Sequence, residues 1–231
     1  MQAIRALARG LLVLSLVPTA AAQEVRRTLI QGVEVIEFPF AFVLTNSIWK
    51  STTIPVCWEN PSTADAALRE ETRAAVRETW ETHSPIRFVD WGRCTDEQLG
   101  IRIRIAEDVT YGPHVKALGN YLDGMPAGMV LNFRFNRWGQ SCQQRIVFCV
   151  RAIAVHEFGH ALGFAHEHNR GDTPPECLND NKPSGPDGDW KVTEYDPYSI
   201  MNYCNKPWLG NGRLSARDIE GLQRIYGKPA Q

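Results

Sequence analysis

The alternation of apolar and polar positions predicts short strands in the first half of the chain. Residues 101–105 alternate isoleucine with arginine, which predicts a strand with one buried face. Runs rich in β-branched and aromatic residues predict further strands at 54–58, 86–91 and 128–135. The run at 128–135 is the last one before the predicted helix at 146–162, and we expect it to form the edge of the sheet, with an interior strand as the alternative interpretation.

Helical spacing of apolar residues predicts three helices. The first covers residues 63–83, with Ser62 as its N-cap, and the second covers 146–162. The third covers 215–226, where Ser215 begins a capping-box pattern. Strands that come first and helices that cover them indicate an α+β class with a mixed sheet.

The N-terminal part of the chain determines the expected domain organisation. Residues 1–22 combine early arginines, the apolar run Leu11–Val17 and the small residues Ala20–Ala22, and this combination predicts a cleaved signal peptide rather than an amphipathic helix. Residues 23–47 then form a lead-in or a short pro-segment, and 48–231 form the main domain. The protein is therefore expected to be secreted, periplasmic or extracellular.

The charge balance and the apolar runs of the sequence bear on which partners to expect. The 231 residues carry 25 basic and 26 acidic side chains, a formal net charge of -1. This balance gives no reason to expect nucleic acid or an anionic membrane as a partner. No apolar run after residue 22 is long enough to span a bilayer. The sequence does not determine the oligomeric state, and we expect a monomer.

Six cysteines suit an exported protein. An even number of cysteines in an oxidising compartment predicts disulfides. No two cysteines have the C-x-x-C spacing, so a four-thiolate zinc site is not expected. Six cysteines allow about 15 full pairings, so the sequence leaves the connectivity open. Closeness along the chain favours Cys142 with Cys149 and Cys177 with Cys204, which leaves Cys57 with Cys94.

Histidines gather in the predicted second helix. His156 and His160 are four residues apart, so they lie on one face of the helix and can bind one metal ion. Glu157 lies about 100° around the helix, close to such an ion but poorly placed as a ligand. This is the place for a base that acts on water at the metal.

A third histidine can reach the same ion only if the helix ends. His166 would face away on a continuous helix, but Gly163 can adopt the left-handed conformation that turns the chain back. Three imidazoles with a fourth position open indicate one catalytic Zn2+. Two or three ordinary core histidines are the alternative interpretation. The remaining histidines, including His168, His83 and His114, are expected to be surface or satisfied core residues.

The motif resembles the elongated zinc motif of the metzincin metalloproteases. Residues 199–203 are similar to the metzincin Met-turn, and Tyr203 follows the methionine by two positions. The similarity is closest to the astacin family, and it covers most of residues 46–227. The residues that carry the astacin resemblance are Phe164, Glu167, Arg170, Asp172 and Tyr203.

The resemblance implies a metzincin-like zincin catalytic domain at 48–231, with two lobes around a zinc cleft. It implies a zinc-dependent endopeptidase that cuts protein or peptide substrates. By this resemblance Glu157 is the general base for a zinc-activated water. Tyr203 stabilises the oxyanion and is a further metal ligand when no substrate is bound. Met201 forms an apolar floor beneath the histidines, and Glu167 would meet the mature N-terminus.

Two other functions stay open from the sequence alone. One is a catalytically inactive zinc fold used for binding, although Glu157 and Tyr203 argue against it. The other is a protease dedicated to one partner. Residues 171–190 are rich in Pro, Gly, Asp and Asn and predict an irregular loop. Its acidic residues Asp180, Asp187 and Asp189 could bind calcium, but solvated turn residues are the favoured interpretation.

Overall fold

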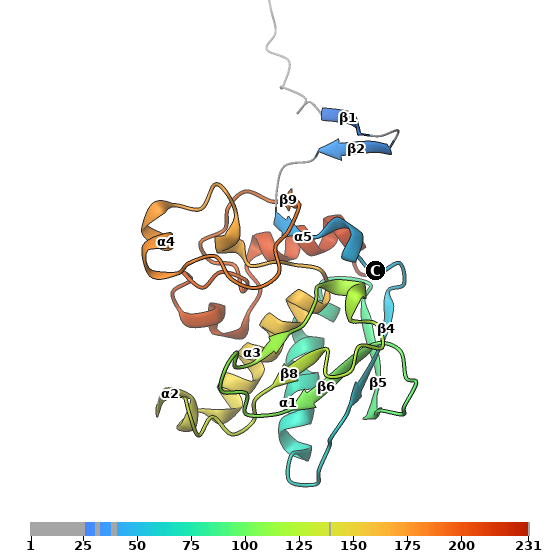
Figure 1. Ribbon diagram of the computed structural model, residues 1–231, viewed down its shortest axis with the longest axis vertical. Helices are drawn as coiled ribbons and strands as arrows, with labels where there is room; N and C mark the ends of the chain where they lie inside the picture. Colours follow the sequence, from blue (N-terminus) through green and yellow to red (C-terminus); the bar gives the residue numbers. More distant parts are fainter. Residues whose placement is uncertain (1–25, 31–32, 38–40, 139, 231) are drawn as a thin grey trace, which may run out of the picture. The chain divides into compact units, whose positions relative to one another are not determined.

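The computed structural model in Figure 1 describes residues 26–30, 33–37, 41–138 and 140–230. The predicted signal peptide therefore lies outside the described residues. Two compact units divide the chain at residues 37 and 38. The first unit contains an antiparallel pair, β1 (Arg26–Ile30) with β2 (Val33–Glu37), and Arg26 pairs with Glu37 across it.

The second unit contains a five-stranded mixed sheet, as expected for an α+β protein. Four neighbouring strands are parallel, and the fifth, β7, pairs antiparallel with β8. Parallel neighbours need crossover connections, and α1 forms the one between β4 and β5. In spatial order the strands are β5 (Arg87–Arg93), β4 (Thr53–Trp58), β6 (Ile101–Ile105), β8 (Met129–Leu131) and β7 (His114–Val115).

The predicted edge strand is wrong in both length and place. β8 ends at Leu131 because the Asn132 side chain accepts hydrogen bonds from the backbone N–H groups of Arg134 and Phe135, which closes a turn. β8 also lies between β6 and β7, so it is an interior strand. The edge strand on this side of the sheet is β7, which is too short to produce a recognisable alternation.

The first helix lies within its predicted range, 63–83, but starts three residues later and ends two residues earlier. α1 (Ala66–Val76) continues directly into η2 (Arg77–Glu81), a turn of π-helix. Ser62 is not the N-cap, because Asp65 occupies that position. The Ser62 hydroxyl instead donates to the Asp65 carboxylate at 2.5 Å.

The long helix α3 (Ile146–Ala161) lies beside α1 against the sheet (Figure 1). Aromatic side chains fill the space between these elements. The Trp80 indole N–H donates to the Val155 carbonyl at 2.9 Å, and Phe158 makes edge-on contact with Phe88 of β5 at a 4.8 Å centroid separation. These contacts fix α3 to the core. A short helix, α2 (Gln140–Gln143), precedes it.

The second half of the unit is more regular than predicted. The expected irregular loop contains a short helix, α4 (Pro175–Asp180), and ends in a strand, β9 (Trp190–Val192). α5 (Ala216–Tyr226) begins with the predicted capping box. Short 3-10 turns occur at η1 (Thr45–Ser47), η3 (Gly119–Leu122) and η4 (Glu167–Asn169). The segment η5 (Trp208–Gly212) is an irregular turn in which residues 209–211 have positive φ.

The second unit begins before the expected domain start at residue 48. β3 (Ala41–Val43) pairs antiparallel with β9, which comes from the far end of the chain. The predicted lead-in thus contains residues that belong to the main fold, and they contact the metal-site segment described below.

All three expected disulfides are present. Because disulfides persist in oxidising compartments, they agree with an exported protein. They join Cys57 to Cys94, Cys142 to Cys149 and Cys177 to Cys204.

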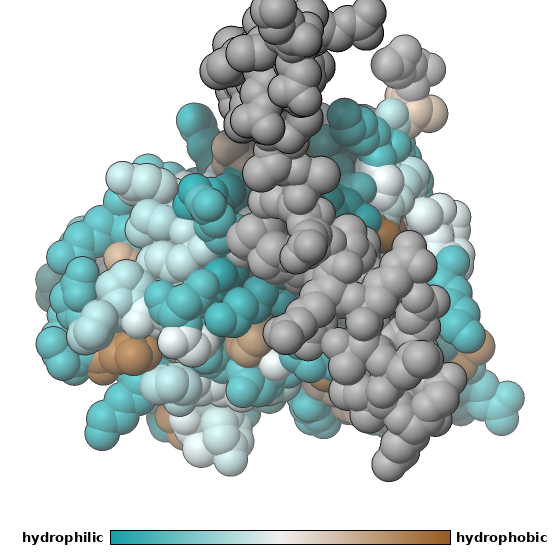
Figure 2. Space-filling model, turned by 90° about the horizontal axis from the view of Figure 1, so that it is seen from above, coloured by the Kyte–Doolittle hydropathy of each residue, from teal (hydrophilic) through white to brown (hydrophobic). Residues whose placement is uncertain are grey.

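One face of the molecule is seen in Figure 2. Where it is not covered by grey atoms, the face in Figure 2 is mainly hydrophilic, with hydrophobic residues only as scattered spots. Within the described ranges, no helix has both the length and the apolar character needed to cross a bilayer.

Candidate metal centre

The candidate site is built on the last turns of α3. This helix is buried almost all round, so His156, His160 and Glu157 lie in an apolar environment. Its final carbonyl groups are satisfied by side chains from distant parts of the chain. The Trp49 indole donates to the Ala161 carbonyl at 2.7 Å, and the Tyr226 hydroxyl donates to the Leu162 carbonyl at 2.8 Å.

The helix ends at the predicted glycine. Gly163 has φ +95°. Its N–H donates to the His160 carbonyl at 2.9 Å, and the Phe164 N–H donates to the Gly159 carbonyl at 3.0 Å. These two bonds form a Schellman motif, which reverses the chain and satisfies the terminal carbonyls. The expected role of Gly163 is confirmed.

The chain after the turn is held by β3. The Leu44 N–H donates to the Gly163 carbonyl at 3.1 Å, and the Ala165 N–H donates to the Phe42 carbonyl at 2.8 Å. The segment therefore runs extended along β3 and returns His166 beneath the helix. Nothing in the sequence pattern indicated that residues 41–44 support the third histidine.

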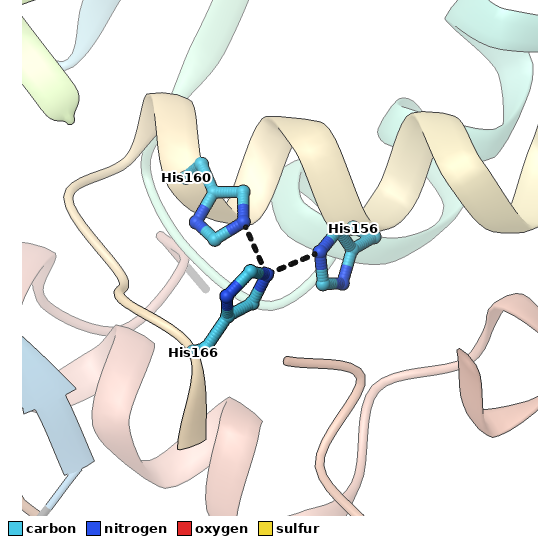
Figure 3. Close-up of side chains that lie close together, drawn as sticks. All are labelled: His156, His160 and His166. Atoms are coloured by element: carbon cyan, nitrogen blue, oxygen red, sulfur yellow. Dashed lines mark hydrogen bonds between the residues drawn. The ribbon is translucent and has the colours of Figure 1, made fainter. Parts of the chain in front are cut away.

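The three predicted histidines converge, as Figure 3 shows. His156 and His160 point down from one face of α3, and His166 points up from the returning segment. Their Nε2 atoms meet: the Nε2 of His166 lies 3.2 Å from that of His156 and 3.1 Å from that of His160. Among the described residues, this is the group of metal-binding side chains close enough to share one ion.

The second ring nitrogen of each histidine is anchored to a backbone carbonyl. The Nδ1 atoms of His156, His160 and His166 lie 2.8, 2.7 and 2.8 Å from the carbonyl oxygens of Ile200, Phe164 and Ser184. A carbonyl oxygen can only accept, so each Nδ1 carries the proton. Each neutral ring therefore presents an Nε2 lone pair to the common centre.

This arrangement fits zinc. Three lone pairs that face one another repel, and a cation between them removes the repulsion. Tetrahedral zinc with bonds of about 2.05 Å places its nitrogen ligands about 3.3 Å apart, close to the observed separations. Burial lowers the pKa of His156 to about 3 and lowers the pKa values of His160 and His166, which favours the neutral ligand form.

Glu157 lies next to the histidine cluster with one unpaired oxygen. The residue is 4% exposed, and its Oε2 atom has no hydrogen-bond partner in the described structure. Burial raises its pKa to about 8 in the metal-free protein. A nearby dication favours the ionised form and opposes this effect. The carboxylate is thus available to a water molecule in the cleft.

Tyr203 lies against the cluster. Its ring centroid is 4.4 Å from that of His166 and 5.5 Å from that of His156. Partial burial and the nearby Glu157 raise the phenol pKa, so the hydroxyl keeps its proton at neutral pH. Tyr203 is 46% exposed and faces the cleft.

His168 has more contact with the site than the sequence suggested. It is fully buried, its ring stacks on Tyr203 at 4.8 Å, and its Nδ1 accepts a 3.4 Å hydrogen bond from the Tyr203 backbone N–H. Its Nε2 has no partner among the described residues. His168 is therefore a core histidine that supports Tyr203. Its position two residues after His166 carried no signal of this role.

The Met-turn is tied to both neighbouring helices. The Asp218 carboxylate of α5 accepts from the Ser199 hydroxyl at 2.7 Å and from the Ile200 N–H at 2.9 Å. Met201 is buried against Gly159 of α3, where an added Cβ atom would lie 2.4 Å from the methionine sulfur. The turn thus packs directly beneath the helix that carries two of the histidines.

We expect Gly159→Ala to destabilise the fold despite the better helix propensity of alanine. The propensity gain is at most about 1 kcal/mol. Overpacking against Met201 and Trp80 costs about 1–3 kcal/mol, because both neighbours are buried. Urea unfolding measures the difference. Gly171→Ala is the control, since its Cβ would meet nothing within 4 Å. Equal stability of the two variants would contradict the tight packing.

Glu167 and Arg170 form a buried ion pair below the site. The guanidinium lies 3.2 Å from the Glu167 carboxylate and donates to both Asp172 oxygens at 2.8 and 2.7 Å. Glu167 also accepts from the Asp196 N–H at 2.8 Å. Its carboxylate thus has partners within this unit. The expected contact with a mature N-terminus remains a prediction, because the start of the chain lies outside the described residues.

The remaining acidic residues and histidines of interest lie outside the histidine cluster. Asp180, Asp187 and Asp189 are not among the described residues grouped around a possible metal ion. Asp189 instead accepts hydrogen bonds from the backbone and hydroxyl of Thr45. His114 lies on β7 and lines the cleft, and His83 borders a separate surface hollow.

Two hollows flank the histidine cluster and together form the cleft. The His166 hollow, about 480 Å³, is bordered by residues 113–116 and 184–186. The His156 hollow, about 330 Å³, is bordered by Trp138, Ile153, Asn181, Trp208 and Leu209. Residues before Gly163 thus form one wall and residues after His166 form the other. This arrangement matches the expected two lobes.

Comparisons with known proteins agree with this geometry. The model of the Astacin peptidase family matches residues 139–175. Interstitial collagenase of Bos taurus is 24% identical over 201 residues, which cover 84% of this chain and 35% of the collagenase. Nematocyst expressed protein 6 of Nematostella vectensis is 34% identical over 89 residues, covering 33% of this chain and 30% of that protein. The chain spans about a third of the length of these curated relatives.

A solved structure described as "Structure of myroilysin" has the same fold. It superposes with a TM-score of 0.57 at 19% identity, covering 81% of this chain and 99% of that one. The shared fold, the histidine cluster and the match over residues 139–175 make the chain similar to the metzincin class of zinc metalloproteases. Within that class it is astacin-like, because the astacin family model matches the segment that contains the zinc motif.

Proposed function

We propose that the protein is a zinc endopeptidase that hydrolyses internal peptide bonds. The observation that carries the proposal is the convergence of the three Nε2 atoms of His156, His160 and His166, each fixed by an Nδ1 contact with a carbonyl. Such a set supplies three ligands and leaves one position open, the pattern of catalytic zinc sites. We assign one catalytic ion to this set.

Glu157 and Tyr203 are the proposed catalytic residues. Zinc, when bound, supplies a Lewis acid that polarises the carbonyl and acidifies water. Glu157 accepts a proton from the attacking water and delivers it to the leaving amine. The Tyr203 hydroxyl donates a hydrogen bond to the developing oxyanion. In the absence of substrate, Tyr203 is also proposed as a further metal ligand.

An inactive zinc fold used only for binding is the second candidate. Glu157 argues against it, because a buried carboxylate with an unpaired oxygen is costly to keep without a role. The purified protein should cut an unfolded protein mixture. A chelator should stop cleavage, and added zinc should restore it. Binding of one zinc per chain without any cleavage would favour the binding protein.

The substrate backbone is proposed to add to β7. The Lys116 N–H bonds to the Gly128 carbonyl of the β8 side, so its neighbour Val115 directs its own N–H and C=O to the opposite side. Val115 borders the His166 hollow. An extended peptide can pair there and receive affinity from main-chain hydrogen bonds.

Val115→Pro is expected to lower kcat/KM on long peptides by up to about tenfold, because it removes one outward N–H donor. The bonds to β8 are made by the neighbouring residues and should persist. Val115→Ala is the matched control, since it shortens the same side chain but keeps the donor. Peptide kinetics together with zinc analysis and thermal unfolding make the comparison. A normal rate for the proline variant would place the substrate strand elsewhere.

Export and domain roles complete the proposal. Residues 1–22 are proposed as the signal peptide. The expected division into a lead-in or pro-segment at 23–47 and a metalloprotease catalytic domain at 48–231 is kept with one change: the catalytic domain is proposed to include β3 (Ala41–Val43), because β3 pairs with β9. The three disulfides support secretion. Mass spectrometry of the secreted protein gives the mature N-terminus directly.

A further inference from the structure

We propose that a hollow at the carboxyl ends of the parallel strands binds a free α-amino acid. This strand-end hollow has a volume of about 260 Å³ and is bordered by residues from the segments 60–65, 105–107 and 132–134. The segments lie at or just after the ends of β4, β6 and β8, which are parallel neighbours, so they meet at one edge of the sheet. In open α/β sheets, ligands bind in crevices outside this edge. No bordering residue is shared with the two hollows of the metal cleft.

Asn132 brings a buried hydrogen-bond donor to this hollow. The residue is 2% exposed, and its side-chain oxygen accepts from the backbone N–H groups of Arg134 and Phe135. These bonds fix the orientation of the amide, so its NH2 group is the part left for another partner. The nitrogen has no hydrogen-bond partner among the described residues. An unpaired buried donor is unfavourable, which favours a ligand that brings an acceptor.

The β8 side of the hollow also carries a positive charge. Arg134 borders the hollow two residues after Asn132, and it is exposed. Its guanidinium has no ion-pair or hydrogen-bond partner among the described residues. An amide NH2 group and a guanidinium are both pure donors, and together they suit a carboxylate.

The β4 and β6 side carries the opposite charge. Glu107 follows β6, and its carboxylate oxygens accept from the Arg137 backbone N–H at 2.9 Å and the Asn136 amide at 3.2 Å, which holds the group in place. Asp65 occupies the N-cap position of α1 but accepts no N–H of that helix. Among the described residues, its carboxylate accepts from the Ser62 hydroxyl alone. A carboxylate oxygen can accept more than one hydrogen bond, so both groups can bind an ammonium.

Opposite charges on the two sides of one small hollow match a zwitterion. β4 and β8 lie on either side of β6, and neighbouring strands are about 4.8 Å apart, so the hollow spans roughly 10 Å. An α-amino acid with a hydrogen bond of about 2.8 Å at each end covers this distance. The volume lies just below the range of about 300–1,000 Å³ for sites that take larger organic ligands. An inorganic anion would instead meet the two carboxylates.

L-Alanine is the probe that tests the proposal. We expect saturable binding to the zinc-loaded protein, with a shift of the Asn132 side-chain NH2 signals in heteronuclear NMR spectra. N-acetyl-L-alanine keeps only the carboxylate and L-alaninamide only the ammonium, so each should bind at least about tenfold more weakly. The Asn132 signals separate this hollow from the metal centre, which an amino acid can also approach. Alanine that leaves these signals unchanged would overturn the proposal.

Variants on both sides of the hollow provide the second arm. Arg134→Gln and Asp65→Asn should each raise the Kd for L-alanine by about tenfold, because each removes one charged partner. Arg137→Gln and Asp96→Asn are the matched controls, since these exposed residues have the same charges but do not border the hollow. The controls should bind L-alanine like the wild-type protein. An unchanged Kd in both hollow variants would contradict the assignment.

Calcium is the competing ligand, because two carboxylates also suit that ion. The donor of Asn132 and the guanidinium of Arg134 oppose a bare cation. Excess calcium should therefore leave the Kd for L-alanine unchanged. Calcium binding that Glu107→Gln abolishes, combined with displacement of L-alanine by calcium, would make the hollow a cation site and overturn the proposal.

Discussion

Glu157→Gln is expected to lower kcat by at least about 10²-fold while the protein still binds one zinc ion. Glutamine keeps the shape of the side chain but cannot accept a proton from water. The three histidines do not depend on Glu157 for their anchoring, because backbone carbonyls hold them. Peptide kinetics and metal analysis by emission spectroscopy measure the two quantities separately.

The raised pKa of Glu157 predicts a second effect of the Glu157→Gln substitution, on the pH dependence of stability. Burial raises the pKa of Glu157 from 4.5 to about 8 in the metal-free fold. Between these pH values the carboxyl group is ionised in the unfolded chain but protonated in the fold, so the free energy of unfolding decreases as the pH rises. Glutamine removes that loss, and the metal-free variant should melt higher than wild type at pH 8 but not at pH 4.5. Glu97→Gln, on an exposed loop, is the control for both measurements. Turnover near the wild-type rate would exclude Glu157 as the base.

Arg170→Met is expected to cost about 3–5 kcal/mol of unfolding free energy. The Arg170 side chain is only 1% exposed and that of Glu167 only 6%, so removing the guanidinium leaves a buried carboxylate without its cation. The substitution also removes the donor to the Thr193 carbonyl at 2.8 Å. Because Glu167 is adjacent to His166, zinc affinity should fall as well. Urea unfolding and zinc titration measure the two effects.

Two comparisons isolate the buried charge as the cause. Arg217→Met breaks an exposed pair with Glu194, whose side chain is 70% exposed, and should cost no more than about 1 kcal/mol. The double variant Glu167→Gln with Arg170→Met leaves no buried carboxylate of Glu167 without a cation and should recover part of the stability, since Asp172 is 47% exposed and stays 3.4 Å from Lys191. If Arg170→Met proved no more harmful than Arg217→Met, the ion pair would not stabilise the fold.

The histidine cluster could be predicted because its determinants are local. The i, i+4 spacing of His156 and His160 and the conformational freedom of Gly163 act within one helix and one turn, so the residue pattern is enough to predict them. The disulfides were predictable for a related reason: two of the pairs join cysteines in the same stretch of chain, which leaves the third pair by elimination.

The remaining features depend on contacts between distant segments. β7 has two residues and exists because β8 pairs with it, so no periodicity in its own sequence marks it as the edge. The support that β3 gives to the segment after Gly163 joins residues more than a hundred positions apart. The walls of the His156 hollow likewise come together from α3, η5 and the loop around Trp138. A single sequence carries no signal for such encounters.

The shortness of β7 also bears on self-association. A sheet edge is a template on which any extended chain can pair, and long exposed edges lead to aggregation. Two residues present too few free backbone groups to hold another copy of the chain by pairing alone. Pairing with β7 adds useful affinity only for a ligand that makes further contacts at the same time. The histidine cluster lies beside β7 and can provide such contacts. The strand proposed to receive an extended substrate is therefore too short to act as a template for aggregation.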